Sequence, residues 1–161
     1  MKRTPSPADS TIKAYFELTK PSITLLILIS TALGFFLGMD GMVNPIKFLI
    51  TLMGSGLVSS GSGALNHYAE QDLDKLMNRT KSRPIPSGLI SSNNAFIFGI
   101  FLTLLGTIIL YLWVNELTAI LALSTAILYL FVYTPLKRLT WLNTSIGAIP
   151  GAMPPLGGWV A

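Results

Sequence analysis

Residues 46–65 read IKFLITLMGSGLVSSGSGAL and carry one charge, at Lys47. Residues 66–88 follow with NHYAEQDLDKLMNRTKSRPIPSG and hold seven of the chain's eighteen charged side chains. An apolar run of about twenty residues is long enough to cross the hydrocarbon core of a bilayer. The charged stretch is therefore expected where a membrane-spanning helix meets water.

Three oxygen-bearing side chains in the charged stretch, Asn66, Glu70 and Asp74, are spaced four residues apart. A helix turns about 100° per residue, so these side chains fall within roughly 80° of one another on one face. Asp72 lies between them in sequence but points roughly 160° away from Glu70 on a regular helix. The pattern predicts a divalent-cation site formed by Asn66, Glu70 and Asp74, with Asp72 ranked lower.

Basic side chains follow the acidic face: Lys75, Arg79, Lys81 and Arg83. Carboxylates beside guanidinium groups suit a site that holds a cation and a phosphate group together, because the cation bridges to phosphate oxygens. The alternative is a solvated helix end with weak ion pairs, which is common in soluble proteins. The position at the end of an apolar span favours a functional site.

The composition predicts a membrane protein. Of 161 residues 51% are hydrophobic and 11% are charged, whereas soluble domains carry roughly 25% charged residues. The net charge of +4 does not indicate a nucleic-acid partner, because the basic residues lie between apolar runs. The chain has no cysteine, and its one histidine, His67, lies about 100° off the acidic face, so neither a thiolate site nor a multi-histidine metal site is expected.

The chain divides into a leader, residues 1–20, and an apolar region, residues 21–161. The leader is polar and basic, lacks the features of a cleaved signal, and is expected to form a short interfacial helix over residues 12–18. Five apolar runs follow, at residues 23–38, 46–65, 95–114, 117–133 and 142–161. The fifth contains Pro150, Pro154 and Pro155 and must be kinked or broken. The expected fold is an all-α, polytopic transmembrane bundle of about five spans.

The basic residues between the spans predict the orientation. The leader contains Lys2, Arg3, Lys13 and Lys20, the loop after the second span contains Lys75, Arg79, Lys81 and Arg83, and the loop after the fourth span contains Lys137 and Arg138. The other side has Lys47 alone. Since cytoplasmic loops are enriched in Lys and Arg, the amino terminus and both polar loops are expected in the cytoplasm, where the loops can meet.

The second polar loop offers Tyr133 and Lys137, four residues apart and so on one helical face. Near a metal-bound diphosphate, the lysine would neutralise charge on the leaving group and the tyrosine hydroxyl would donate a hydrogen bond. The alternative is a topology signal beside an interfacial aromatic residue. The spacing alone does not decide between them.

These motifs resemble those of the UbiA superfamily of intramembrane prenyltransferases. Asn66, Glu70 and Asp74, followed by RTKSRP at residues 79–84, resemble its first acidic motif, and Tyr133 with Lys137 resembles its Tyr-x-x-x-Lys pair. Narrower matches are LTKPSIT at residues 18–24, EQDLD at 70–74 with Met77, and the run 143–159 that ends in GAMPPLGGW. These resemble the branch that farnesylates protoheme IX, over almost all of the chain after the leader.

The resemblance implies a Mg²⁺-dependent reaction in heme biosynthesis: the farnesyl group of farnesyl diphosphate is transferred to a vinyl group of protoheme IX (heme B), giving heme O and diphosphate. It implies a bacterial inner-membrane enzyme whose product passes to heme A synthase. Carried over residue by residue, it assigns Mg²⁺ binding to Asn66, Glu70 and Asp74, diphosphate contacts to Lys20, Arg79, Arg83 and Lys137, and a catalytic role to Tyr133.

One departure from the family pattern concerns length and charge. Members have about nine spans and a second acidic motif, whereas the last acidic residue here is Glu116, on the opposite side. Residues 21–161 are therefore expected to be the N-terminal half of the prenyltransferase domain, inactive alone. Two rival functions stay open: a related prenyltransferase with an aromatic or quinone-precursor acceptor, and a small membrane transporter, although the charges lie at span ends on one side.

Overall fold

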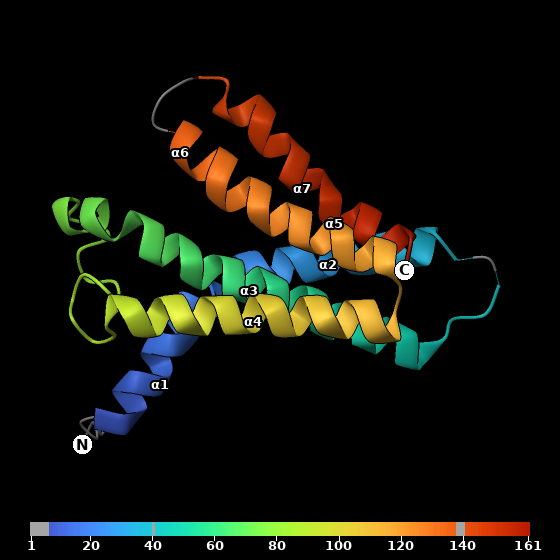
Figure 1. The fold of residues 1–161 in the computed structure, drawn as a ribbon, viewed down its shortest axis with the longest axis horizontal. Helices are drawn as coiled ribbons and strands as arrows, with labels where there is room; N and C mark the ends of the chain where they lie inside the picture. Colours follow the sequence, from blue (N-terminus) through green and yellow to red (C-terminus); the bar gives the residue numbers. More distant parts are fainter. Residues whose placement is uncertain (1–6, 40, 138–140) are drawn as a thin grey trace, which may run out of the picture.

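The acidic stretch lies on the longest helix of the protein, α3 (Pro45–Leu76), which packs against α4 (Ser92–Trp113) along most of its length (Figure 1). The computed structural model describes residues 7–39, 41–137 and 141–161. The two helices are antiparallel and approach closely through glycines. A Cβ atom on Gly106 would lie 2.6 Å from the carbonyl oxygen of Gly54, so no larger residue fits this crossing.

Residue types at the helix starts explain these boundaries. The Asn44 side chain accepts hydrogen bonds from the backbone N–H groups of Ile46 and Lys47, both at 3.1 Å, and Pro45 occupies the first turn of α3. The Ser91 hydroxyl caps α4. The predicted second span, 46–65, thus continues as one helix to Leu76 and carries the acidic face with it.

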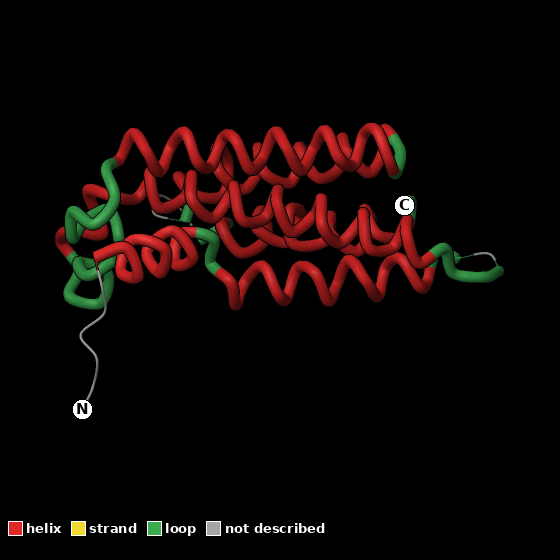
Figure 2. The backbone as a smooth tube through the Cα atoms, turned by 90° about the horizontal axis from the view of Figure 1, so that it is seen from below, coloured by secondary structure: helices red, strands yellow, loops and turns green. Residues whose placement is uncertain are grey.

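The other helices are α1 (Pro7–Leu18), α2 (Pro21–Leu37), α5 (Glu116–Ile127), the π-helix η1 (Leu128–Tyr133), α6 (Thr134–Leu136) and α7 (Asn143–Trp159). The described residues contain no strand, which confirms the all-α prediction. The long helices run alongside one another as a bundle (Figure 2). Residues 1–6 of the leader, with Lys2 and Arg3, and Arg138 of the second polar loop lie outside the described residues.

Helices α2 and α7 run side by side in the same direction. Gly34 and Gly38 of α2 face Pro155 and Trp159 of α7, and a Cβ atom on Gly34 would overlap the Pro155 carbonyl. The predicted break in the fifth apolar run is absent, because α7 is one helix despite its three internal prolines. Neighbouring side chains support carbonyls near its end: the Asn115 amide donates to the Val160 carbonyl at 2.7 Å.

Three helical runs within the described residues are long and apolar enough to cross a membrane: α3, α4 and the continuous run Glu116–Leu136. A fourth is formed if α1 and α2, which meet at a 46° bend, count as one span. Helices α2 and α7, with 17 residues each, form the other two of the five predicted apolar runs. The apolar helices make this a multi-pass membrane protein.

The segment between α3 and α4 folds back onto the bundle. Ile85 and Ile90 are buried against Leu18, Ala64 and Ala95, which joins this segment to the end of α1 and the flanks of α3 and α4. This packing holds the basic residues that follow α3 close to its acidic end.

Candidate functional site

The predicted single-face arrangement is present at the carboxyl-terminal end of α3. Asn66, Glu70 and Asp74 are 1%, 6% and 4% exposed. Asp72 points away from them: its side chain is 86% exposed and forms an ion pair with Lys75 at 3.0 Å. Asn66, Glu70 and Asp74 are therefore buried on the inward face of α3, whereas Asp72 is exposed to solvent.

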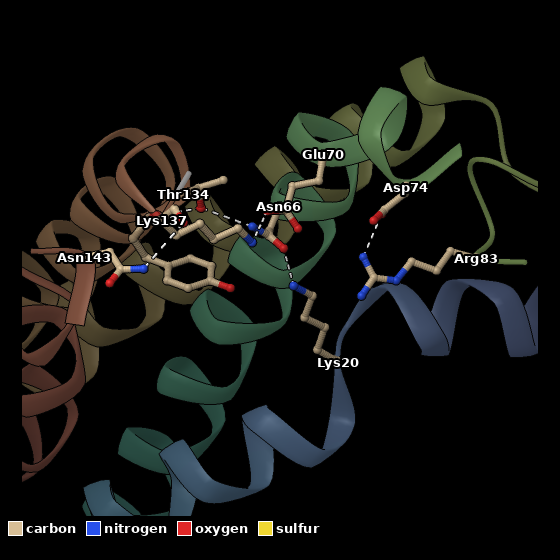
Figure 3. A network of polar contacts seen from close by, with 9 residues as sticks. Lys20, Asn66, Glu70, Asp74, Arg83, Thr134, Lys137 and Asn143 are labelled. Atoms are coloured by element: carbon tan, nitrogen blue, oxygen red, sulfur yellow. Dashed lines mark hydrogen bonds and ion pairs between the residues drawn. The ribbon is translucent and has the colours of Figure 1, made fainter. Parts of the chain in front are cut away.

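Each of these three buried side chains contacts a cationic side chain from a different segment, as Figure 3 shows. The Lys20 ammonium, at the start of α2, donates to the Asn66 Oδ1 atom. Lys137, at the end of α6, forms an ion pair with Glu70. Arg83 Nη1 contacts Asp74 Oδ2 at 2.7 Å. The two polar loops therefore meet, as predicted, and the start of α2 joins them.

The segment after α3 is anchored to Asp74 in a second way. The Thr80 hydroxyl donates to the Asp74 backbone carbonyl at 3.0 Å, and Thr80 is buried. Arg83 thereby returns to the acidic face. Arg79 lies in the turns after α3, directly before Thr80, and its side chain is exposed. The predicted diphosphate contact of Arg79 stays a prediction.

Thr134 also faces α3, and sequence reasoning missed it. The Asn66 amide nitrogen donates to the Thr134 hydroxyl at 3.1 Å, and that hydroxyl donates to the Tyr129 carbonyl at 2.8 Å. Its position toward α3 depends on the π-helix η1, which no residue pattern specified.

Tyr133 faces a different direction from Thr134. Its ring stacks on that of Tyr129, with centroids 5.6 Å apart and an interplanar angle of 20°. A Cβ atom on Gly147 of α7 would lie 2.8 Å from the Tyr133 ring, so the ring fills the space that this glycine leaves. The Tyr133 side chain lines a cavity.

This cavity has a volume of about 640 Å³ and lies between α2, α3, α5, η1 and α7. Lys20 lines it at the end that carries the acidic face, together with Ser62 and Gly63 of α3. Thr31 and Thr118 line it farther into the bundle. The cavity wall is mostly apolar, which suits a ligand with a charged head and a hydrocarbon tail.

Lys20 is a partly buried cation of the site and lies just before the first residue of α2. Burial lowers the pKa of its ammonium group to about 8, and the negative charge of Glu70 opposes part of that shift. An anion bound beside Lys20 would offset the lost hydration and favour its charged form.

The donor set suits a cation that is shared with a ligand. In the described part of the chain, no group of three or more His, Cys, Asp or Glu side chains lies close enough to hold a metal ion. The acidic face instead combines two carboxylates with one amide oxygen. Mg²⁺ typically keeps several waters and binds one or two carboxylates together with phosphate oxygens, so these residues fit a Mg²⁺–diphosphate pair.

The fold and the site define a class: a polytopic membrane protein whose helix ends gather charged side chains at one end of an apolar cavity. Comparison with known proteins places it more narrowly. Residues 27–161 match the UbiA prenyltransferase family, and the chain belongs to this family. Members of the family generally use a divalent metal ion.

The curated relatives include proteins named protoheme IX farnesyltransferase. That of Solibacter usitatus is 45% identical over 159 residues, which cover 93% of this chain and 54% of the relative. Those of Colwellia psychrerythraea and Aquifex aeolicus are 43% and 42% identical, covering 92% and 95% of this chain and 49% and 53% of the relatives. The chain therefore spans about half the length of the curated relatives it matches.

A solved structure supports the fold. A chain from work on digeranylgeranylglyceryl phosphate synthase in membranes superposes with a TM-score of 0.70 at 23% sequence identity, over 89% of this chain and 53% of that one. At this identity the likeness concerns the arrangement of the helices.

Proposed function

We propose that this chain contributes the cation- and diphosphate-binding face of an enzyme that transfers the farnesyl group of farnesyl diphosphate to a vinyl group of protoheme IX, giving heme O and diphosphate. The observation that carries the proposal is the convergence of Asn66, Glu70 and Asp74 with three cations at the head of an apolar cavity. The relatives named protoheme IX farnesyltransferase support the choice of substrates.

The residues divide into two groups by charge. Asn66, Glu70 and Asp74 would hold Mg²⁺, which neutralises negative charge on the diphosphate when bound. Lys20, Arg83 and Lys137 surround these oxygens and donate to the diphosphate, with Arg79 as a further contact from the turn after α3. Residues 21–161 are proposed to form the N-terminal half of the prenyltransferase domain.

The reaction requires stabilisation of the negative charge on the leaving diphosphate and exclusion of water from the allylic carbon. When the bond between the allylic carbon and the diphosphate oxygen breaks, both electrons leave with the diphosphate, and the donors Lys137 and Arg83 stabilise that charge. The cavity excludes water from the allylic carbon. The ring of Tyr133 lines it and presents an aromatic face that attracts positive charge. The π electrons of the vinyl group then form the bond between its terminal carbon and the allylic carbon. The positive charge left on the inner vinyl carbon is quenched by a water molecule, which supplies the hydroxyl of heme O and releases a proton.

The activity assay uses membranes from cells that express the full-length enzyme to which this chain is proposed to contribute, supplied with heme B, farnesyl diphosphate and Mg²⁺. Mass spectrometry is expected to detect heme O and to lose the signal in the Glu70→Gln variant. Prenylation of an aromatic or quinone-precursor acceptor in place of heme B would show that heme B is not the acceptor. Solute flux in proteoliposomes without any diphosphate dependence would support a transporter instead.

We also propose that the protein lies in the bacterial inner membrane with its amino terminus and acidic site in the cytoplasm, and that heme A synthase uses the product. Because the chain has no cysteine, single cysteines report the orientation. Thr11→Cys is expected to resist a membrane-impermeant maleimide in spheroplasts and to react after permeabilisation. Met42→Cys, at a position 98% exposed on the opposite side, is the control that reacts without permeabilisation. Labelling of Thr11→Cys in intact spheroplasts would overturn the orientation.

A further inference from the structure

The amide of Asn66 is fixed at both ends, although the residue is almost fully buried. Its oxygen accepts from the Lys20 ammonium, and its nitrogen donates to the Thr134 hydroxyl at 3.1 Å (Figure 3). An amide presents an acceptor on one side and donors on the other, so its orientation decides which atom faces the site.

The hydroxyl of Thr134 has one proton, and that proton is committed. It is donated to the Tyr129 carbonyl at 2.8 Å, and a carbonyl oxygen can only accept. The hydroxyl oxygen is therefore left as an acceptor toward α3. Only the NH₂ side of the Asn66 amide can face it, and this turns Oδ1 toward Lys20 and the acidic face.

The π-helix η1 places Thr134 for this contact. The Thr134 backbone N–H donates to the Tyr129 carbonyl, five residues earlier, as in a π turn. The same carbonyl therefore receives both the backbone and the side-chain donor of Thr134, which holds the side chain in one position. Thr134 is 5% exposed, so water does not compete for its hydroxyl.

We propose that Thr134 is a positioning residue that fixes the Asn66 amide with its oxygen toward the cation site. The inference rests on the proposed function, which assigns Mg²⁺ to Asn66 and diphosphate to Lys20. When Lys20 contacts diphosphate, the hydrogen bond from Asn66 to Thr134 is what keeps the amide nitrogen out of the site. A hard cation binds the amide oxygen and not the amide nitrogen.

The test measures cation binding directly. Mn²⁺ replaces Mg²⁺ as a paramagnetic probe and is titrated with inorganic diphosphate into the purified protein in nanodiscs, and bound Mn²⁺ is read by electron paramagnetic resonance. Thr134→Val keeps the side-chain shape and removes both hydrogen bonds. It is expected to weaken Mn²⁺ binding by about 10- to 100-fold, as loss of a residue that orients a metal ligand does. Thr134→Ser is expected to retain binding.

Two controls separate positioning from folding. Thr107→Val on α4 removes a hydroxyl that bonds only within its own helix, at 2.8 Å to the Thr103 carbonyl, and is expected to leave Mn²⁺ binding unchanged. Asn66→Asp replaces the amide with a carboxylate whose two oxygens are equivalent. In that background Thr134→Val is expected to change Mn²⁺ binding by less than about twofold, because no orientation is left to fix.

The outcomes distinguish the two proposals. If Glu70→Gln leaves Mn²⁺ binding intact, the cation site of the proposed function is wrong. If Glu70→Gln abolishes binding while Thr134→Val binds like the unchanged protein, only the positioning role fails. An equal loss from Thr134→Val in the Asn66→Asp background, or a loss from Thr134→Ser as large as that from Thr134→Val, would also overturn it.

Discussion

Two helix ends meet at the site and differ in their backbone. The end of α3 is a regular α-helix that presents Asn66, Glu70 and Asp74 at steps of four residues. The run Glu116–Leu136 reaches the site through the π turn of η1, and the polar contacts to the acidic end of α3 come from Thr134 and Lys137, three residues apart. A regular helix can be read from sequence periodicity, whereas a π turn changes which residues share a face.

The difference has a chemical counterpart. The end of α3 supplies buried carboxylates and an amide, and the end of the other run supplies the cation Lys137 and the Thr134 hydroxyl, which accepts from the Asn66 amide. Bound together they leave few unmatched charges in an apolar environment. The expected consequences of disturbing each side are ordered below from the largest to the smallest.

Substitutions of the carboxylates at the end of α3 are expected to lower activity the most. Glu70→Gln or Asp74→Asn removes an anionic oxygen that a hard cation requires, and activity should fall by at least about 100-fold. The measurement is heme O formation across a Mg²⁺ titration, with protein levels equalised by immunoblot. Full activity in either variant at low Mg²⁺ would remove the acidic face from the mechanism.

At the facing helix end, Lys137→Met keeps most of the side-chain stem and removes the charge. We expect a loss of about 10- to 100-fold in kcat/KM for farnesyl diphosphate, because a donor to the leaving diphosphate is missing. Lys75→Met, at an exposed lysine on the opposite side of α3, is the matched control and should change little. Equal losses in both variants would indicate a general effect of charge.

Arg79 and Arg83 both follow α3 and both belong to the motif RTKSRP at residues 79–84, so their variants can be compared directly. Arg83→Gln leaves the buried carboxylate of Asp74 without its cation and is expected to lower kcat/KM about tenfold, or roughly 1.4 kcal/mol. Arg79→Gln, at an exposed position, should cost about a fifth of that free energy or less. The ranking is measured with both variants in the same membranes, and its reversal would assign the closer diphosphate contact to Arg79.

The smallest effect is expected at Asp72. Its side chain is exposed and pairs with Lys75, and such surface ion pairs contribute about 0–1 kcal/mol. Asp72→Asn should therefore keep activity within about twofold of the unchanged protein. If Asp72→Asn proved more damaging than Asp74→Asn, the buried face of α3 would not be the face that binds the cation.

Much of the α3 side was predictable from the sequence, because hydrophobicity and periodicity act locally. The apolar run 46–65 predicted the span, the four-residue steps predicted the buried face, and the distribution of Lys and Arg predicted that the two polar loops lie on one side. The contact of Lys137 with Glu70 confirms that these loops meet.

The long-range features were not predictable in this way. Lys20 reaches Asn66 across 46 residues of sequence, because α2 packs beside α3 with its start at the acidic end. Its place at the site followed only from the family resemblance. The role of Thr134 depends on a π turn that no residue pattern specified. The unbroken course of α7 through its three internal prolines was not predictable from the proline rule for a single segment.

The sequence separations within the site also bear on how it is assembled during synthesis. Arg83 is nine residues from Asp74, whereas Thr134 is 68 residues from Asn66. At a translation rate of about 5–20 residues per second, the end of α3 exists for several seconds before Thr134 and Lys137 are made. Lys20 is already made when the acidic end is synthesised and Arg83 follows directly, whereas the contacts of Thr134 and Lys137 are the last to close the site.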